Sequence, residues 1–143
     1  MRKVLFGVAF MALSASAARV EVCPQAFERG GGALDPQFMD VMGSPYLIAH
    51  GLGTRVCDAK AKVSVPEAGI YTVWARTRNW ADGAPGKFRI AVNGQVLGKT
   101  LGADQRTWGW ERAGTVSLAA GPAEIRLQDL TGFDGRCAGV VQV

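Results

Sequence analysis

One stretch of alternating polarity, GIYTVWARTRNW at residues 69–80, constrains the fold of this chain more than any other. A β-strand places alternate side chains on opposite faces of its sheet, so this stretch predicts a strand with two different faces. We expect the core-facing set to be Tyr71, Val73, Ala75 and Thr77. We expect the opposite set to be Trp74, Arg76, Arg78 and Trp80.

The aromatic face of that strand has two interpretations. Two indoles around two guanidiniums suit a polar, ring-shaped or anionic ligand. Trp and Arg side chains that alternate on a strand also commonly stack on one another over a sheet, with no ligand. The stretch alone does not choose between a binding platform and such stacking.

Short strand-like segments separated by turn residues recur along the rest of the chain. The sequence contains 19 glycines and no long helical period, and Asn93-Gly94 is a strong signal for a tight hairpin. We expect one short helical turn over 35–42, with Asp35 as its cap and Pro36 at its first position. This pattern predicts an all-β antiparallel sandwich. The expected strands are 18–22, 46–49, 55–65, 69–80, 87–92, 95–101, 107–119, 123–128 and 138–143, with irregular chain over 24–35.

The first residues have the pattern of a secretory signal peptide. Basic Arg2 and Lys3 precede an apolar run over 4–13, and Ala15-Ser16-Ala17 forms a small-residue cleavage site. The apolar run is too short to span a bilayer, which takes about 20 residues. We therefore expect residues 1–17 to be removed, residues 18–143 to form a single domain without a membrane span, and the protein to be secreted or periplasmic.

The charge and the cysteines of the sequence argue against a nucleic-acid partner and against a zinc site. Removal of Arg2 and Lys3 lowers the formal net charge from +4 to +2, and the remaining basic residues are scattered singly, which argues against a nucleic-acid partner. Three cysteines allow at most one intramolecular disulfide, and their spacing matches no zinc motif. We expect a Cys23–Cys137 bridge, because the first and last strands of a sandwich are commonly neighbours.

Motifs for catalysis are incomplete. Gly51-Leu52-Gly53 lacks the third glycine and the βαβ context of a dinucleotide site, and no Gly-x-Ser-x-Gly elbow is present. His50 is either a general base or a structural hydrogen-bonding residue, and Asp129 and Asp134 are either solvated loop acids or a cation site. We therefore expect no enzymatic activity, no cofactor and no metal site.

The aromatic residues favour a sugar site over catalysis. An aromatic ring can stack under the apolar face of a pyranose while charged and amide groups bind its hydroxyls. Arginines also favour acidic glycans through bidentate contacts with carboxylates. The expected ligand-binding residues are Arg76, Arg78, Asn79, Trp80, Trp108, Trp110 and Asp134.

Three stretches resemble a known module: QFMDVMGSPYLIAHGLG at 37–53, YTVWARTRNW at 71–80 and LQDLTGFDGRC at 127–137. They resemble the golvesin/xanthan-lyase carbohydrate-binding-like domain of bacterial proteins named as FAD-dependent oxidoreductases or xanthan lyases. The resemblance implies a jelly-roll-like β-sandwich that is non-catalytic and usually attached to a larger enzyme. The flavin or lyase domain itself is not in this sequence.

The resemblance also bears on calcium. Related sugar-binding sandwiches often hold a structural calcium with an opening Glu-Ala-Glu and an Asp in the last strand. Glu21-Val22-Cys23 keeps only the first acid, and Ala138 stands where that Asp is expected. A hard cation takes six to eight oxygen ligands, so we expect no tight calcium at this position.

Two hypotheses for function follow. The first is an exported, non-catalytic carbohydrate-binding-like module whose partner is a glycan or polysaccharide, with acidic glycans favoured. The alternative is a structural or docking domain, or a truncated C-terminal part of an FAD-dependent oxidoreductase or polysaccharide lyase, that packs against a separate catalytic domain and binds no sugar. Faces rich in Trp and Arg also resemble protein interface hot spots.

Overall fold

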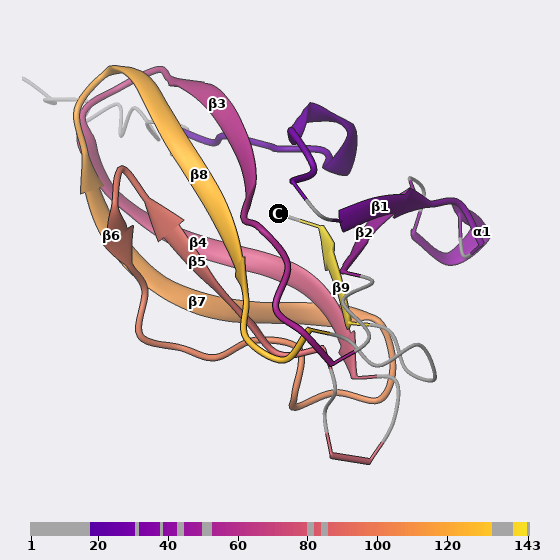
Figure 1. Cartoon of the computed structure of the whole chain (residues 1–143). Coiled ribbons are helices and arrows are strands. Elements are labelled where there is room, and N and C mark those ends of the chain that lie inside the picture. Colours follow the sequence, from indigo (N-terminus) through magenta and orange to yellow (C-terminus); the bar gives the residue numbers. More distant parts are fainter. Residues whose placement is uncertain are drawn as a thin grey trace, which may run out of the picture.

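A computed structural model describes residues 18–30, 32–37, 39–42, 45–49, 53–79, 82–83, 86–132 and 139–142. The chain forms two antiparallel sheets that face each other (Figure 1), so the predicted all-β sandwich is confirmed. The elements, in chain order, are η1 (Pro24–Ala26), β1 (Gly32–Asp35), α1 (Met39–Met42), β2 (Tyr46–Ala49), β3 (Ala59–Val65), β4 (Gly69–Asn79), β5 (Phe88–Val92), β6 (Gln95–Val96), β7 (Gly109–Leu118), β8 (Gly121–Asp129) and β9 (Gly139–Gln142).

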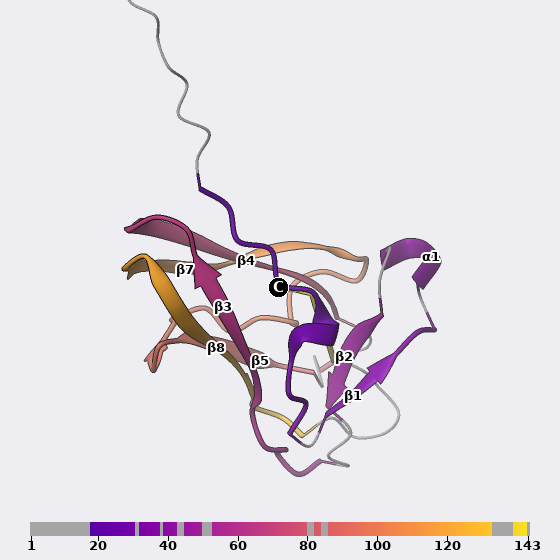
Figure 2. The ribbon, with the colours of Figure 1, turned by 90° about the horizontal axis from the view of Figure 1, so that it is seen from above.

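The two sheets combine segments that are far apart in the sequence. One sheet has the strand order β1-β2-β9-β4-β7, and the other has the order β3-β8-β5-β6. Seen from above, β4 and β7 lie in one layer, and β3, β8 and β5 lie in the other (Figure 2). The β1–β2 hairpin and α1 lie together at one end of the molecule (Figure 1). The long strand β4 is thus an interior strand of its sheet, between β9 and the edge strand β7.

The core lies between the two layers and follows the alternation of the strands. β4 contributes the fully buried Ala75 and Thr77, as its sequence pattern predicts. β5 contributes Ile90, which is also fully buried. Five further buried apolar side chains of this cluster come from β3, β7 and β8: Ala61, Ala113, Val116, Ile125 and Leu127.

The predicted Asn93-Gly94 hairpin is confirmed between β5 and β6. Both residues have positive φ angles, 48° and 82°, as a tight hairpin turn with the twist of the flanking strands requires. The turn is also fastened to β8. The Asn93 amide donates to the Glu124 carbonyl at 2.9 Å, and the Glu124 amide donates to Asn93 Oδ1 at 2.8 Å.

The N-terminal part differs from its prediction in three places. Residues 18–22 alternate in burial, with Val20 and Val22 against the core, but they form no strand, because they make no ladder with a described neighbour. The expected irregular stretch 24–35 contains β1, which pairs with β2. Asp35 ends that strand and accepts a hydrogen bond from the Gln37 amide at 2.8 Å, so α1 begins later than predicted, at Met39.

Two predicted strands are shorter in the structure. The segment 55–65 becomes a strand only from Ala59, because Arg55 and Val56 are bound to Asp129 at the end of β8. The segment 95–101 keeps only β6 and an isolated bridge between Phe88 and Leu101. In the part of the chain that the structure describes, no helix is long and apolar enough to cross a membrane.

Candidate functional site

The outer face of β4 and β7 carries two Trp–Arg pairs. In the β4–β7 ladder, Trp74 lies opposite Arg112 and Arg76 lies opposite Trp110. Each indole therefore has one arginine across the ladder and another two residues away on its own strand. Cross-strand neighbours of this kind have Cβ atoms about 5 Å apart, and diagonal ones remain within reach of long side chains. We call these four residues the Trp–Arg face.

A β-bulge in β7 creates this arrangement. Val73 pairs with Gly114, but Trp74 pairs with Arg112, so Ala113 is the extra residue. A one-residue slip moves all later side chains to the other face of a strand. Without the slip, Trp110 would point toward the core and Glu111 would point outward. Gly114, with φ of 155°, supplies backbone freedom at the bulge.

The two indoles of the Trp–Arg face are unusually accessible. Trp74 is 47% exposed and Trp110 is 54% exposed. Ile70, on the same side of β4, is 80% exposed. Large apolar side chains gathered on one exposed face commonly mark a contact surface for a ligand or partner.

A groove adjoins the Trp–Arg face. It has a volume of about 780 Å³ and lies between the N-terminal segment 18–23 and the first half of β4. Trp74 and Trp110 line it together with Thr72 and the charged residues Arg19, Glu21 and Glu67. The volume lies within the range of about 300–1,000 Å³ that is typical of small-molecule sites. Aromatic and polar groups thus converge on one ligand-sized depression.

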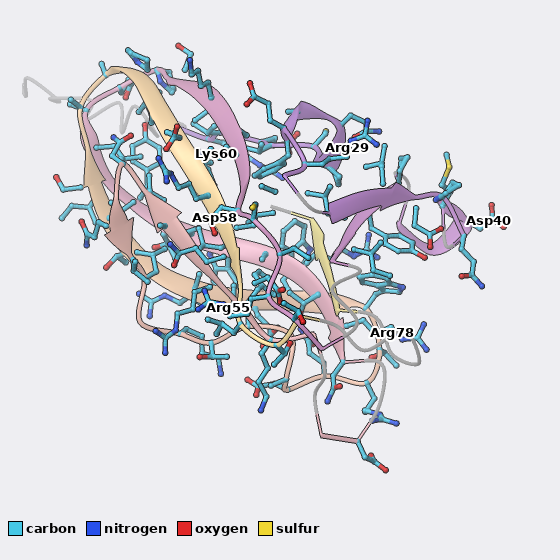
Figure 3. All side chains as sticks on the ribbon, in the orientation of Figure 1. Arg29, Asp40, Arg55, Asp58, Lys60 and Arg78 are labelled. Atoms are coloured by element: carbon cyan, nitrogen blue, oxygen red, sulfur yellow. The ribbon has the colours of Figure 1, made fainter. Side chains whose placement is uncertain are left out.

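Three of the predicted site residues make contacts within the protein near the end of β4. Arg78 Nε donates to the Arg106 carbonyl at 3.2 Å, and Asn79 Nδ2 donates to the Ala103 carbonyl at 2.8 Å, so both side chains hold the loop between β6 and β7. Figure 3 shows Arg78 at this end of the strand. The half-buried Trp108 precedes β7 and packs against Tyr46, with ring centroids 5.6 Å apart.

The predicted set therefore divides into two places. Arg76 and Trp110 meet on the Trp–Arg face, whereas Arg78, Asn79 and Trp108 lie around the β6–β7 loop. Trp108 precedes β7, whereas Trp110 lies within it. Trp80, Asp134 and His50 lie outside the described residues. Trp74 and Arg112, which complete the Trp–Arg face, were not among the predicted ligand-binding residues, although Arg112 lies two residues after Trp110.

Two buried carboxylates have structural roles. Glu111 Oε2 accepts hydrogen bonds from Thr77 Oγ1 and from the Gly102 amide. Asp129 accepts three backbone bonds, from the amides of Val56, Thr131 and Gly132, at 3.0–3.1 Å.

The Asp129 carbonyl also accepts from Arg55 Nε at 2.6 Å, and Figure 3 shows Arg55 beside the end of β8. Gly132, with φ of 61°, packs its Cα so close to the Thr54 carbonyl that a side chain has no room. These contacts identify Asp129 as the anchor of the segment before β3.

Other titratable groups give no catalytic constellation in the described part of the chain. Burial raises the pKa of Tyr46 to about 12, and the negative charge of Asp35 and a hydrogen bond to it act in the same direction. Among the described residues, no three His, Cys, Asp or Glu side chains are grouped to hold a metal ion. Glu21, the first acid of the calcium pattern, lies 2.5 Å from Arg19 in an exposed ion pair, and Ala138 is outside the described residues.

The predicted disulfide is not tested by the described residues. Cys23 and Cys57 are exposed. Cys137 lies outside the described residues, so the Cys23–Cys137 bridge stays a prediction.

Several solved structures have the same architecture as this chain. A family 35 carbohydrate-binding module from Clostridium thermocellum superposes with a TM-score of 0.64 at 20% identity, over 86% of this chain and 92% of the module. The fold is that of a family 35 carbohydrate-binding module. The β-(1,4)-mannanase GH26-CBM35 of Podospora anserina matches with a TM-score of 0.67 at 15% identity, over 87% of this chain. A Paenibacillus cycloisomaltooligosaccharide glucanotransferase matches with a TM-score of 0.62 at 17% identity.

The coverage of these structures is uneven. The chain spans 26% of the mannanase chain and 17% of the glucanotransferase chain, but nearly the whole of the C. thermocellum module. No protein-family model and no curated protein matches the sequence. The resemblance to the golvesin/xanthan-lyase domain therefore stays a prediction, while the broader likeness to carbohydrate-binding β-sandwiches is established at the level of fold.

Proposed function

We propose that this protein is an exported carbohydrate-binding module that binds glycans on the Trp–Arg face, with carboxylate-bearing glycans preferred. The observation that carries the proposal is the pair of half-exposed indoles, Trp74 and Trp110, each beside arginines and at the mouth of a ligand-sized groove. Keeping two large rings in contact with water costs hydrophobic free energy, which a sugar stacked on them would recover.

The arginines define the preferred ligand. A guanidinium binds a carboxylate through two parallel hydrogen bonds, and this geometry distinguishes Arg from Lys. Arg76 and Arg112 occupy one diagonal of the Trp–Arg face and the two indoles occupy the other, so a ring stacked on either Trp has a guanidinium beside it. A uronic acid offers both the apolar ring face and the carboxylate that this arrangement would bind.

The proposal is tested by alanine substitution of each indole. We expect Trp110→Ala and Trp74→Ala each to weaken binding to an acidic polysaccharide about tenfold or more, as loss of a central aromatic contact commonly does. Affinity electrophoresis in gels containing polygalacturonate, alginate, hyaluronan or a neutral glucan would measure the loss. Val96→Ala is the matched control, because Val96 is similarly exposed at 46% but lies on the other sheet.

The arginine part of the proposal has its own variants. Arg76→Lys and Arg112→Lys keep the charge but lose the bidentate geometry, so they should reduce the preference for acidic over neutral glycans. Binding to acidic glycans should also weaken with added salt. Unchanged retention of both Trp variants, in proteins with native melting temperatures, would overturn the proposal.

A second function has one observation in its favour. The mannanase and glucanotransferase contain this fold as a minor part of a longer chain, so such a domain can also serve as a packing or docking unit. The Trp–Arg face would then contact a catalytic domain. A wild-type protein that binds no glycan, but whose Trp74 and Trp110 are buried on addition of a partner enzyme domain, would favour this alternative.

A further inference from the structure

The first half of β7 has two possible registers on β4, and they expose opposite side chains. The second half is fixed, because Val116 is 4% exposed and faces the core. Continuous alternation backward from Val116 would turn Arg112 and Trp110 toward the core and Glu111 outward. The bulge at Ala113 reverses the face of each of these residues. The observed strand is therefore in a bulged register, and the alternative is a continuous one.

The bulged register is not the one that hydrophobicity favours. It leaves Trp110 54% exposed and buries Glu111, which is 6% exposed. Burial of an indole is favourable, whereas burial of a carboxylate is costly unless its oxygens are hydrogen-bonded. Both of these side chains taken alone would prefer the continuous register, so another residue must oppose it.

Arg112 is the residue that opposes the continuous register. There it would lie opposite Ala75, which is 0% exposed and belongs to the apolar core cluster. A guanidinium has five N–H donors and does not lose its charge in proteins, so its burial among apolar side chains is very costly. In the bulged register Arg112 is exposed, and Ala113, which is 2% exposed, takes an inward place. The choice of register is thus a choice between burying Arg112 and burying Glu111.

Glu111 is the easier of these two charges to bury, because donors meet it in the bulged register. Its Oε2 accepts hydrogen bonds from Thr77 Oγ1 and from the Gly102 amide. Gly102 follows Leu101, whose amide donates to the Phe88 carbonyl of the other sheet at 2.9 Å. The carboxylate therefore connects β7 to both sheets. An outward-facing Glu111 would lose these bonds.

We infer that Arg112 is a positioning residue whose charge keeps the first half of β7 in the bulged register and so keeps Trp110 at the surface. This role goes beyond the proposed function, because it does not depend on a bound glycan. An apolar side chain at position 112 removes the charge that opposes the continuous register. β7 should then lose its bulge and bury Trp110, and Glu111 should face outward, opposite Arg76.

Hydroxyl-radical footprinting of the full protein tests this inference, since mass spectrometry measures each tryptophan separately. Arg112→Leu should lower the modification of Trp110 about fivefold, as its exposed fraction falls from 54% to that of a core side chain, and should leave Trp74 exposed. Arg112→Gln should leave Trp110 modified as in the wild type, because a buried amide without partners is also costly. Arg89→Leu is the matched control, because it makes the same change at an exposed residue of β5 in the other sheet. Equal protection of Trp110 in either of the last two variants would overturn the inference.

Deletion of Ala113 distinguishes a change of register from a local effect of leucine. Without Ala113, continuous alternation from Val116 turns Trp110 outward again, because every residue before the deletion changes face. The double variant, Arg112→Leu with Ala113 deleted, should therefore regain the wild-type modification of Trp110. Wild-type modification in Arg112→Leu alone, or protection of Trp110 in the double variant, would overturn the inference. If Arg112→Leu does not fold, Arg112→Ala takes its place with the same expectations.

The outcomes separate this inference from the proposed function. If Arg112→Leu protects Trp110 while Trp110→Ala is retained by glycan gels as the wild type is, the role of Arg112 stands and the proposed function is wrong. If Trp110→Ala loses retention while Arg112→Leu leaves Trp110 exposed, the Trp–Arg face stands and the role of Arg112 is wrong.

Discussion

Removal of the carboxylate of Asp129, the last residue of β8, is predicted to destabilise the fold strongly. The side chain is 7% exposed and accepts bonds from the amides of Val56, Thr131 and Gly132. Hydrogen bonds to a charged group contribute about 1.5–3 kcal/mol each, and the contributions are not additive. Since two of the three donors are only partly buried and can bind water, Asp129→Ala should cost about 3–5 kcal/mol.

That cost translates into a clear thermal shift. For a domain of this size, 1 kcal/mol corresponds to roughly 3–5 °C, so Asp129→Ala should lower the melting temperature by about 10–20 °C. Asp129→Asn keeps one acceptor oxygen but turns an NH₂ group toward one of the backbone donors, so it should lie between alanine and wild type.

Circular dichroism during heating and during urea titration would measure both variants. Asp82→Ala is the control, because Asp82 is a fully exposed loop acid in an ion pair with Arg106 and its loss should leave the melting temperature unchanged. A shift for Asp129→Ala of less than about 3 °C would refute the reasoning that this carboxylate anchors the segment before β3.

Two further predictions concern the five-stranded sheet. Thr77→Val removes the hydroxyl that donates to Glu111 and should lower the free energy of unfolding by about 1–3 kcal/mol in urea titrations, with Thr77→Ser largely restoring it; equal stability of all three proteins would contradict the role of this bond. The pKa of Tyr46 is raised from 10.0 to about 12 by burial and by Asp35, so its neutral form stabilises the fold at pH values below 10, and this stabilisation is lost between about pH 10 and 12. Unfolding measured across that range should show a decline that is smaller in Tyr46→Phe, and an identical decline in both would argue against it.

Local signals were sufficient for the long strand β4 and for one turn. The alternation at 69–80 predicts which side chains of β4 are buried, since side-chain period depends on the strand alone. Asn93-Gly94 predicts its hairpin because the required positive φ angles suit those two residues. The structure confirms both features.

Features that depend on how two distant segments pair could not be predicted from the local sequence pattern. The bulge at Ala113 is defined by the register with β4, and it decides that Trp110 and not Glu111 faces outward. One signal for it exists in the sequence, the break in alternation at Ala113-Gly114. Asp129 binds an amide 73 residues earlier in the chain, and no local spacing indicates such a contact.

The site prediction was limited in the same way. Arg76 and Trp110 meet because two strands pair in one register, and that register also adds Trp74 and Arg112. Trp74 is predicted to face outward, but it is not among the expected ligand-binding residues, because a single strand does not show what covers its outer face. The groove depends on the N-terminal segment, whose position the sequence does not indicate.

Oxidative footprinting with and without an acidic oligosaccharide tests the central claim most directly. Hydroxyl radicals modify exposed indoles, and mass spectrometry measures the modification of each Trp separately. The account predicts that bound hyaluronan hexasaccharide protects Trp74 and Trp110 and leaves Val96, on the other sheet, unprotected. Protection confined to Trp80 and Trp108, with Trp74 and Trp110 modified as in the free protein, would contradict it.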